Sequence, residues 1–251
     1  MPKRWCRGCW IAALVLPLFG IAGLLMVAKE HFMEQQNSPF AGTDVLSLSQ
    51  AVAEDDVWQI SQQATAERQH VRGDLQITLL QWAILQQRPG SVQALIQAGA
   101  DIGQPGMEGN GVLHTAAMVK DAQYLRLLLQ QAPQVNMRNL VTGATPLAAA
   151  VLAGREEQVR MLLNAGADST LSDRVGDTPL HLAAKINAPQ LALLLLQTGA
   201  DAKAQNQQGR TFQYYFAQTP VHLQNSELRE QYRQLEIWLK SQQLAGHYTQ
   251  P

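Results

Sequence analysis

Two cysteines near the start of the chain are the side chains best suited to redox or metal chemistry. Cys6 and Cys9 stand in the stretch WCRGCW, and the 251-residue chain has no other cysteine. A redox Cys-x-x-Cys site requires a preceding strand and a following helix, and a zinc site requires two more ligands. Only five residues precede Cys6, and an uncharged stretch follows Cys9 directly. We therefore expect a basic segment at a membrane surface, and acylation, metal binding or redox activity would be the competing roles of the cysteines.

The remaining reactive side chains form no recognisable catalytic arrangement. None of the six histidines belongs to a His-Glu-x-x-His motif, and the chain has no P-loop and no Gly-x-Ser-x-Gly motif. The acidic groups at residues 54–56 and 156–157 are expected on solvated helix starts. We predict that the protein is not an enzyme, and we expect no cofactor and no metal site.

An apolar stretch predicts a membrane anchor. Residues 10–28 read WIAALVLPLFGIAGLLMVA and carry no charge. As a helix they would be about 28 Å long, close to the roughly 30 Å of a bilayer core. Lys3, Arg4 and Arg7 precede the stretch, so the positive-inside rule places the N-terminus in the cytoplasm. The expected segments are a basic cytoplasmic foot at residues 1–9, a transmembrane helix at 10–28 and a polar linker at 29–44.

The compartment follows from this orientation. A cleaved signal peptide is the rival interpretation, but residues 26–28 form a poor cleavage site because Met26 is not small. The exported part has no cysteine and no Asn-x-Ser/Thr sequon, which favours a bacterial periplasm over a eukaryotic lumen. We expect a single-pass protein of the inner (cytoplasmic) membrane, with residues 29–251 in the periplasm.

Charge argues against nucleic acid as a partner. Residues 29–251 contain 16 basic and 20 acidic residues, a net charge of −4. A nucleic-acid surface normally requires a basic stripe, and the sequence shows none.

A repeat of about 33 residues organises the rest of the chain. The stretch GDTPLHLAA at 176–184 aligns with GATPLAAAV at 143–151, GNGVLHTAA at 109–117 and QITLLQWAI at 76–84. A second element recurs as VQALIQAGAD at 92–101, VRMLLNAGAD at 159–168 and LALLLLQTGAD at 191–201. A single unit of this kind cannot bury its own apolar face, so the units must stack.

These boxes closely resemble the ankyrin repeat family. The resemblance implies an all-α solenoid in which helix pairs alternate with β-turn fingers, here over residues 45–245 and followed by a tail at 246–251. About five to six repeats with degenerate caps are expected. Thr178 suits an N-cap, Pro179 a first helical turn, and His181 can bond back to the threonine hydroxyl. The motif residues expected to shape the repeats are Thr145, Pro146, Thr178, Pro179, His181, Gly99, Gly166 and Gly199.

Binding of another protein is the function that the resemblance implies. Ankyrin proteins grip partners with finger tips and with exposed residues of the first helix of each pair. Carried over by register, the candidate positions are Met107, Glu108, Asn110, Met118, Val119, Arg138, Leu140, Val141, Leu152, Ala153, Arg174, Val175, Asp177, Lys185, Ile186, Gln207, Gln208 and Arg210. Many are aliphatic at positions where core packing does not require it, which is typical of a protein interface.

The sequence therefore predicts a monomeric, membrane-displayed binding module for a protein of unknown identity. Two narrower roles remain open within binding: a scaffold or helper for an enzyme, and an immunity-type protein that neutralises a toxin. Outside these roles, the same sequence would also suit a structural spacer or a cytoplasmic-facing adaptor of inverted topology.

Overall fold

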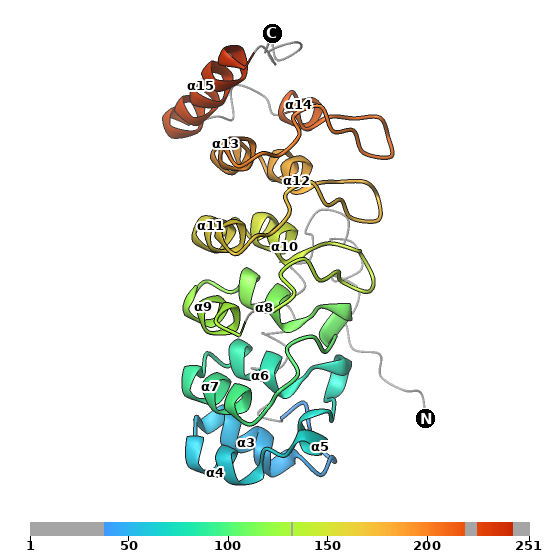
Figure 1. Ribbon diagram of the computed structural model, residues 1–251, viewed down its shortest axis with the longest axis vertical. Coiled ribbons are helices and arrows are strands. Elements are labelled where there is room, and N and C mark those ends of the chain that lie inside the picture. The colour runs from blue at the N-terminus through green and yellow to red at the C-terminus, as the bar shows by residue number, and fades with distance from the viewer. Residues whose placement is uncertain (1–37, 132, 219–224, 243–251) are drawn as a thin grey trace, which may run out of the picture. The chain divides into compact units, whose positions relative to one another are not determined.

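Pairs of short antiparallel helices follow one another along the chain (Figure 1). The computed structural model describes residues 38–131, 133–218 and 225–242. The helices form two rows, and the row beside the fingers is called the inner row. The inner helices are α3 Leu46–Glu54, α6 Leu79–Leu85, α8 Val112–Met118, α10 Pro146–Leu152, α12 Pro179–Lys185 and α14 Phe212–Phe216. Their outer partners are α4 Val57–Gln63, α7 Pro89–Gln97, α9 Gln123–Leu129, α11 Glu156–Asn164, α13 Pro189–Gln197 and α15 Ser226–Ser241.

The loop that precedes each inner helix from α6 to α14 forms a finger, and the fingers project to one side of the stack (Figure 1). Two short 3-10 helices, η1 Asp74–Gln76 and η2 Met107–Gly109, form the tips of the first two fingers. A further short helix, α5 Ala66–Gln69, leads into the first finger. We number the fingers one to five by their tips at residues 73–76, 106–109, 139–143, 173–176 and 206–209.

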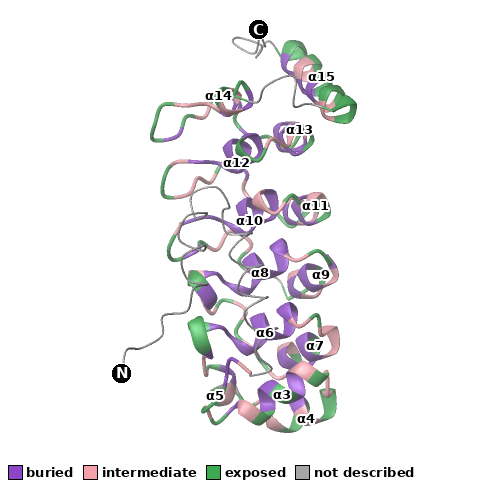
Figure 2. Ribbon diagram, turned by 180° about the vertical axis from the view of Figure 1, so that it is seen from behind, coloured by how far each residue is buried: buried purple, intermediate pink, exposed green. Residues whose placement is uncertain are grey.

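The core consists of equivalent apolar positions stacked from repeat to repeat. Leu80, Leu113, Leu147 and Leu180 are all at most 4% exposed. In α14 the series ends, and Phe212 and Phe216 are the buried side chains there. Alanines surround them in α10 and α12, so that neighbouring helices can approach closely. Figure 2 shows the buried residues gathered along the two rows of helices.

Helix ends follow from the repeated boxes. The Thr145 hydroxyl accepts a hydrogen bond from the backbone N–H of Ala148, as an N-cap does, and Pro146 and Pro179 occupy the first turns of α10 and α12. The outer helices α7, α11 and α13 are followed by glycines with left-handed φ angles, at Gly99, Gly166 and Gly199.

Both ends of the stack are closed by atypical residues. At the N-terminal end, Phe40 is fully buried and the carbonyl of Pro39 accepts a hydrogen bond from the backbone of Asp74 at 2.8 Å. The linker predicted at residues 29–44 is thus too long, because residues 38–44 already belong to the folded domain. At the C-terminal end, Phe216 meets Phe212 and Tyr232 edge to face, and α15 buries Tyr232, Leu235 and Leu239.

The predicted anchor at residues 10–28 and the two cysteines lie outside the described residues. Among the helices that the structure does describe, none has the length and apolar character needed to cross a membrane.

Candidate protein-binding surface

Side chains at the root of each turn set the shape of the last three fingers. The Oδ1 atom of Asn139 accepts hydrogen bonds from the backbone N–H groups of Val141 and Thr142, each at 2.7 Å. Asp173 does the same for Val175 and Asp177, and Asn206 for Gln208 and Arg210. Because Asn and Asp readily cap their own turns, each of these fingers carries its own turn-forming group.

Neighbouring fingers are joined by single backbone hydrogen bonds. The N–H of Leu140 donates to Gly109, that of Arg174 to Thr142, and that of Gln207 to Val175, at distances of 2.9 to 3.2 Å. These bonds link fingers two to five into a ladder and fix their tips relative to one another.

Aliphatic side chains stand exposed on this ladder. Leu140 is 60% exposed, Val141 62% and Val175 54%, whereas most large apolar side chains of the described residues are buried. The tip residues Glu108, Arg174, Gln207 and Gln208 are exposed beside them, as are Arg138 and, on α12, Lys185. Ile186, just after α12, is 36% exposed, and Val119, Leu152, Ala153 and Arg210 are half-buried.

Four of the predicted contact residues are buried instead. Met107, Asn110, Met118 and Asp177 are at most 5% exposed, so the expectation that their side chains are exposed to a partner is wrong. Met118 is buried at the end of α8, where the Arg155 and Gln158 side chains of the following repeat donate to the backbone carbonyls of Met118 and Val119, at 3.0 and 2.8 Å. Met107 lies in the tip of the second finger and Asn110 directly follows that tip, and both are bound by neighbouring repeats, Met107 by Gln81 and Asn110 by Asn139.

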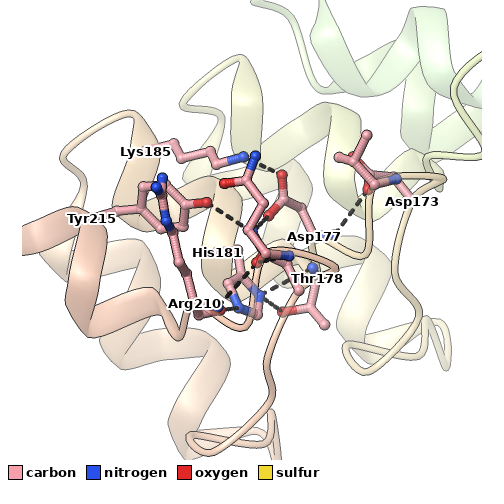
Figure 3. A network of polar contacts seen from close by, with 10 residues as sticks. Asp173, Asp177, Thr178, His181, Lys185, Arg210 and Tyr215 are labelled. Carbon is pink, nitrogen blue, oxygen red and sulfur yellow. Dashed lines mark hydrogen bonds and ion pairs between the residues drawn. The ribbon is translucent and has the colours of Figure 1, made fainter.

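Asp177 anchors a polar network between the fourth and fifth fingers (Figure 3). Its carboxylate forms an ion pair with Lys185 and accepts a hydrogen bond from the amide of Asn206 at 2.8 Å. The same Asn206 amide donates to the Tyr215 hydroxyl at 2.7 Å, and the Lys185 ammonium lies over the Tyr215 ring, 4.8 Å from its centroid. Burying a carboxylate is costly unless it is paired and hydrogen-bonded, so this network is structural.

Histidines link consecutive repeats. The Nε2 atom of His181 donates to the carbonyl of Arg210 at 3.0 Å, while its Nδ1 atom accepts from the Thr178 hydroxyl at 2.9 Å. His114 makes the same link to Ala144 at 3.0 Å, but Gly111 replaces the threonine and leaves Nδ1 without a partner. Burial lowers the pKa of both histidines, which keeps them neutral.

The first repeat makes this link with glutamine. Gln81 occupies the histidine position, donates to the carbonyl of Asn110 at 2.9 Å and accepts from the backbone of Met107 at 3.0 Å. Among the described residues no group of three or more His, Cys, Asp or Glu side chains could hold a metal ion.

The exposed residues of the first finger, Asp74, Leu75 and Gln76, were not among the predicted positions. Leu75, at the tip of the first finger, is 60% exposed. It lies 33 residues before Glu108, so extending the repeat register by one unit would have found it.

Comparison with known proteins decides the family. Residues 80–173 and 113–206 each match the family described as ankyrin repeats (3 copies). The chain belongs to the ankyrin repeat family. Members of this family are protein-binding modules and are typically non-catalytic. A bacterial homologue, Protein PhlB of Serratia liquefaciens, is 64% identical over 168 residues, which cover 67% of this chain and 74% of PhlB.

Two longer ankyrin proteins match only in part. The E3 ubiquitin-protein ligase KEG of Arabidopsis thaliana is 38% identical over 87 residues, 34% of this chain and 5% of that protein. The nuclear factor NF-kappa-B p105 subunit of Gallus gallus is 32% identical over 101 residues, 39% of this chain and 10% of that protein. The ankyrin domain of Bcl-3 superposes with a TM-score of 0.62 over 92% of this chain and 100% of that one, and at 19% identity it shows the fold alone.

Proposed function

We propose that this ankyrin protein is held in a membrane by residues 10–28 and binds a protein partner on the extracytoplasmic side through its fingers. The observation that carries the binding proposal is the exposure of Leu140, Val141 and Val175 on adjacent, hydrogen-bonded fingers. Aliphatic side chains on such loops contribute nothing to the core, and a partner that buries them would gain about 1.5 to 3 kcal/mol for each.

The rigidity of the fingers supports the same proposal. Loops that are ordered before binding lose less conformational freedom when a partner docks. Asn139 and Asp173 hold the third and fourth tips in one conformation, and the ladder aligns them. The half-buried Leu152 and the exposed Ile186 extend this apolar surface from the tips to the ends of the inner helices.

The location rests on the N-terminal charge pattern. Lys3, Arg4 and Arg7 precede the uncharged stretch, and only Lys29 follows it closely. The PhlB homologue is bacterial, so the membrane in this proposal is a bacterial inner membrane, with the repeats in the periplasm. An enzyme helper and a toxin-neutralising protein would both use the same surface, and the identity of the captured partner would distinguish these roles.

Capture of the partner tests the binding proposal. Replacing Leu140, Val141 and Val175 together by serine should abolish recovery of the partner when tagged full-length protein is purified from detergent extracts of the native host. The matched control replaces Val57 and Ile237, which are 46% and 53% exposed on the outer helices α4 and α15, and should recover the partner normally. Equal recovery by both variants, with unchanged circular dichroism, would place the interface elsewhere.

Fusions test the location. Alkaline phosphatase joined after residue 251 should be active, and green fluorescent protein joined at the same place and exported unfolded should stay dark. The opposite pattern would put the repeats in the cytoplasm.

A further inference from the structure

The exposed charges on the fingers change sign from the first two fingers to the last three. The exposed charges of the first two fingers are Asp74 and Glu108, and the flanking Arg72 is half-buried and donates to the carbonyl of Pro105. The last three fingers and their flanks instead carry Arg138 and Arg174, both exposed, and the half-buried Arg210. The aliphatic side chains Leu140, Val141 and Val175 lie within this basic part.

These arginines are held on the outside of the fingers by neutral partners. Arg174 donates from Nη2 to the carbonyl of Leu140 at 2.7 Å. Arg138 donates from Nη1 to the carbonyls of Gly143 and Ser172, at 3.0 and 2.6 Å. The guanidinium of Arg210 lies over the Tyr214 ring, 4.3 Å from its centroid. Within the described ranges none of the three forms an ion pair, so each keeps N–H groups that can grip a carboxylate from outside.

The acids closest to these arginines in the sequence are already occupied. Asp173 accepts two backbone N–H groups of its own finger, and Asp177 is buried in its ion pair with Lys185. Asp168 and Asp201 lie in the loops that lead from α11 and α13 into the fourth and fifth fingers, and they accept hydrogen bonds from the backbone N–H groups of Thr170 and Lys203. Within the described residues none of these carboxylates forms an ion pair with Arg138, Arg174 or Arg210.

A partner that matches this surface combines carboxylates with aliphatic side chains. Nucleic acid fits less well, because Leu140, Val141 and Val175 offer no aromatic ring for base stacking and Asp74 and Glu108 would repel phosphates. We propose that the last three fingers dock an acidic polypeptide segment whose carboxylates face Arg138, Arg174 and Arg210 and whose aliphatic side chains cover Leu140, Val141 and Val175. This inference rests on the proposed function and adds the chemistry and the polarity of the partner.

A random peptide library tests the inference directly. Sixteen-residue peptides displayed on phage are selected against purified full-length protein, and the affinities of enriched peptides are measured by fluorescence anisotropy at low and high salt. The enriched peptides should be rich in Asp and Glu beside Leu, Ile or Val, and their binding should weaken as salt rises.

Charge-removing variants locate the contact. Arg138→Gln with Arg174→Gln keeps a donor for each carbonyl and should weaken these peptides at least tenfold. Asp74→Asn with Glu108→Gln, the matched pair in the first two fingers, should leave their affinity unchanged or slightly higher. Thermal melting shows that each variant is folded.

The outcomes separate this inference from the proposed function. Enriched peptides without excess acid, or unchanged affinity in the arginine variant, would overturn the inference while leaving protein binding by the fingers intact. Peptides that bind the Leu140, Val141 and Val175 serine variant equally well would overturn both. Tighter binding of a single-stranded 20-nucleotide probe than of any peptide would replace the acidic segment with a nucleic acid.

Discussion

The first two fingers and the last three stabilise the turn at the finger tip with different residues. In the last three fingers Asn139, Asp173 and Asn206 cap the turn from within the finger. In the first two the equivalent positions are Gly73 and Gly106, which have no side chain. The cap of the second finger comes instead from Gln81 of the preceding inner helix, whose Oε1 atom accepts from Met107.

The difference shows where a repeat can change without losing its fold. A finger that caps itself can vary at its tip, because its shape does not depend on the helix below. The second finger depends on its neighbour, and its tip residues Met107 and Asn110 are buried accordingly. The exposed aliphatic tips at Leu140, Val141 and Val175 all lie on self-capped fingers.

The largest expected effect concerns the ion pair between Asp177 and Lys185, which joins the fourth finger to α12. Asn206 donates to the carboxylate of Asp177 in the same way that Asn139 donates to the neutral amide oxygen of Asn110, so the second site shows that this link can be made without a charge. Lys185→Met leaves Asp177 buried without its cation and should lower the free energy of unfolding by about 3 kcal/mol, measured by urea denaturation. Adding Asp177→Asn, which copies the neutral site, should restore most of that loss. Failure of the second change to restore stability would mean that the ion pair is not the cause.

Adding a methyl group at Gly106 should displace the Gln81 side chain, which caps the second finger. A Cβ atom at position 106 would lie 1.9 Å from Gln81 Oε1, so Gly106→Ala should displace the side chain and cost about 2 kcal/mol. Gly209→Ala in the self-capped fifth finger meets nothing within 4 Å and should cost only the left-handed strain, about 1 kcal/mol. Equal costs in urea denaturation would show that the two kinds of finger do not differ in this way.

The histidine links between repeats should weaken in acid, whereas the equivalent glutamine link of Gln81 should not. His114 and His181 have lowered pKa values in the folded state, so the unfolded state binds more protons below the unperturbed pKa of about 6.5. Stability is therefore complete above that pH and falls below it, by at most about 1.4 kcal/mol per histidine for one pH unit. His114→Gln with His181→Gln copies Gln81 and should flatten the dependence between pH 5.5 and 7. An unchanged slope in denaturation series across that range would assign the acid sensitivity to other groups.

The smallest expected effect concerns the first finger. Gln76 has a φ angle of +64° at a position where the other four fingers carry glycine. Gln76→Gly should relieve this strain and stabilise the protein by about 0.5 kcal/mol, after allowing for the greater freedom of glycine in the unfolded chain. Gly209→Gln, the reverse change, should destabilise it. A shift of both melting temperatures in the same direction would contradict this interpretation.

The fold could be predicted because the repeat fixes it. The equivalent leucines at 80, 113, 147 and 180 and the boxes around Thr178 and Gly199 determine where helices begin, end and pack. The repeat register alone does not determine which side chains are exposed to solvent. Met118 and Lys185 are the equivalent last residues of α8 and α12, yet Met118 is buried and Lys185 is exposed.

The N-terminal boundary shows a second limit of the sequence. Phe40 stands in a polar stretch with no repeat box, and nothing local indicates that it packs beneath the first repeat. Such contacts arise only when segments distant in sequence come together. The charged network of Asp177 was missed for the same reason, since its partners Lys185 and Asn206 lie in different helices and fingers.

The ladder of single backbone bonds between fingers also provides an internal reporter. The amide protons of Leu140, Arg174 and Gln207 belong to no helix, and each is protected only by a carbonyl of the preceding finger. Their exchange with solvent deuterium therefore requires two adjacent repeats to separate, without either repeat unfolding. Exchange rates at these three amides would measure, one junction at a time, how far the opening of one repeat spreads along the protein.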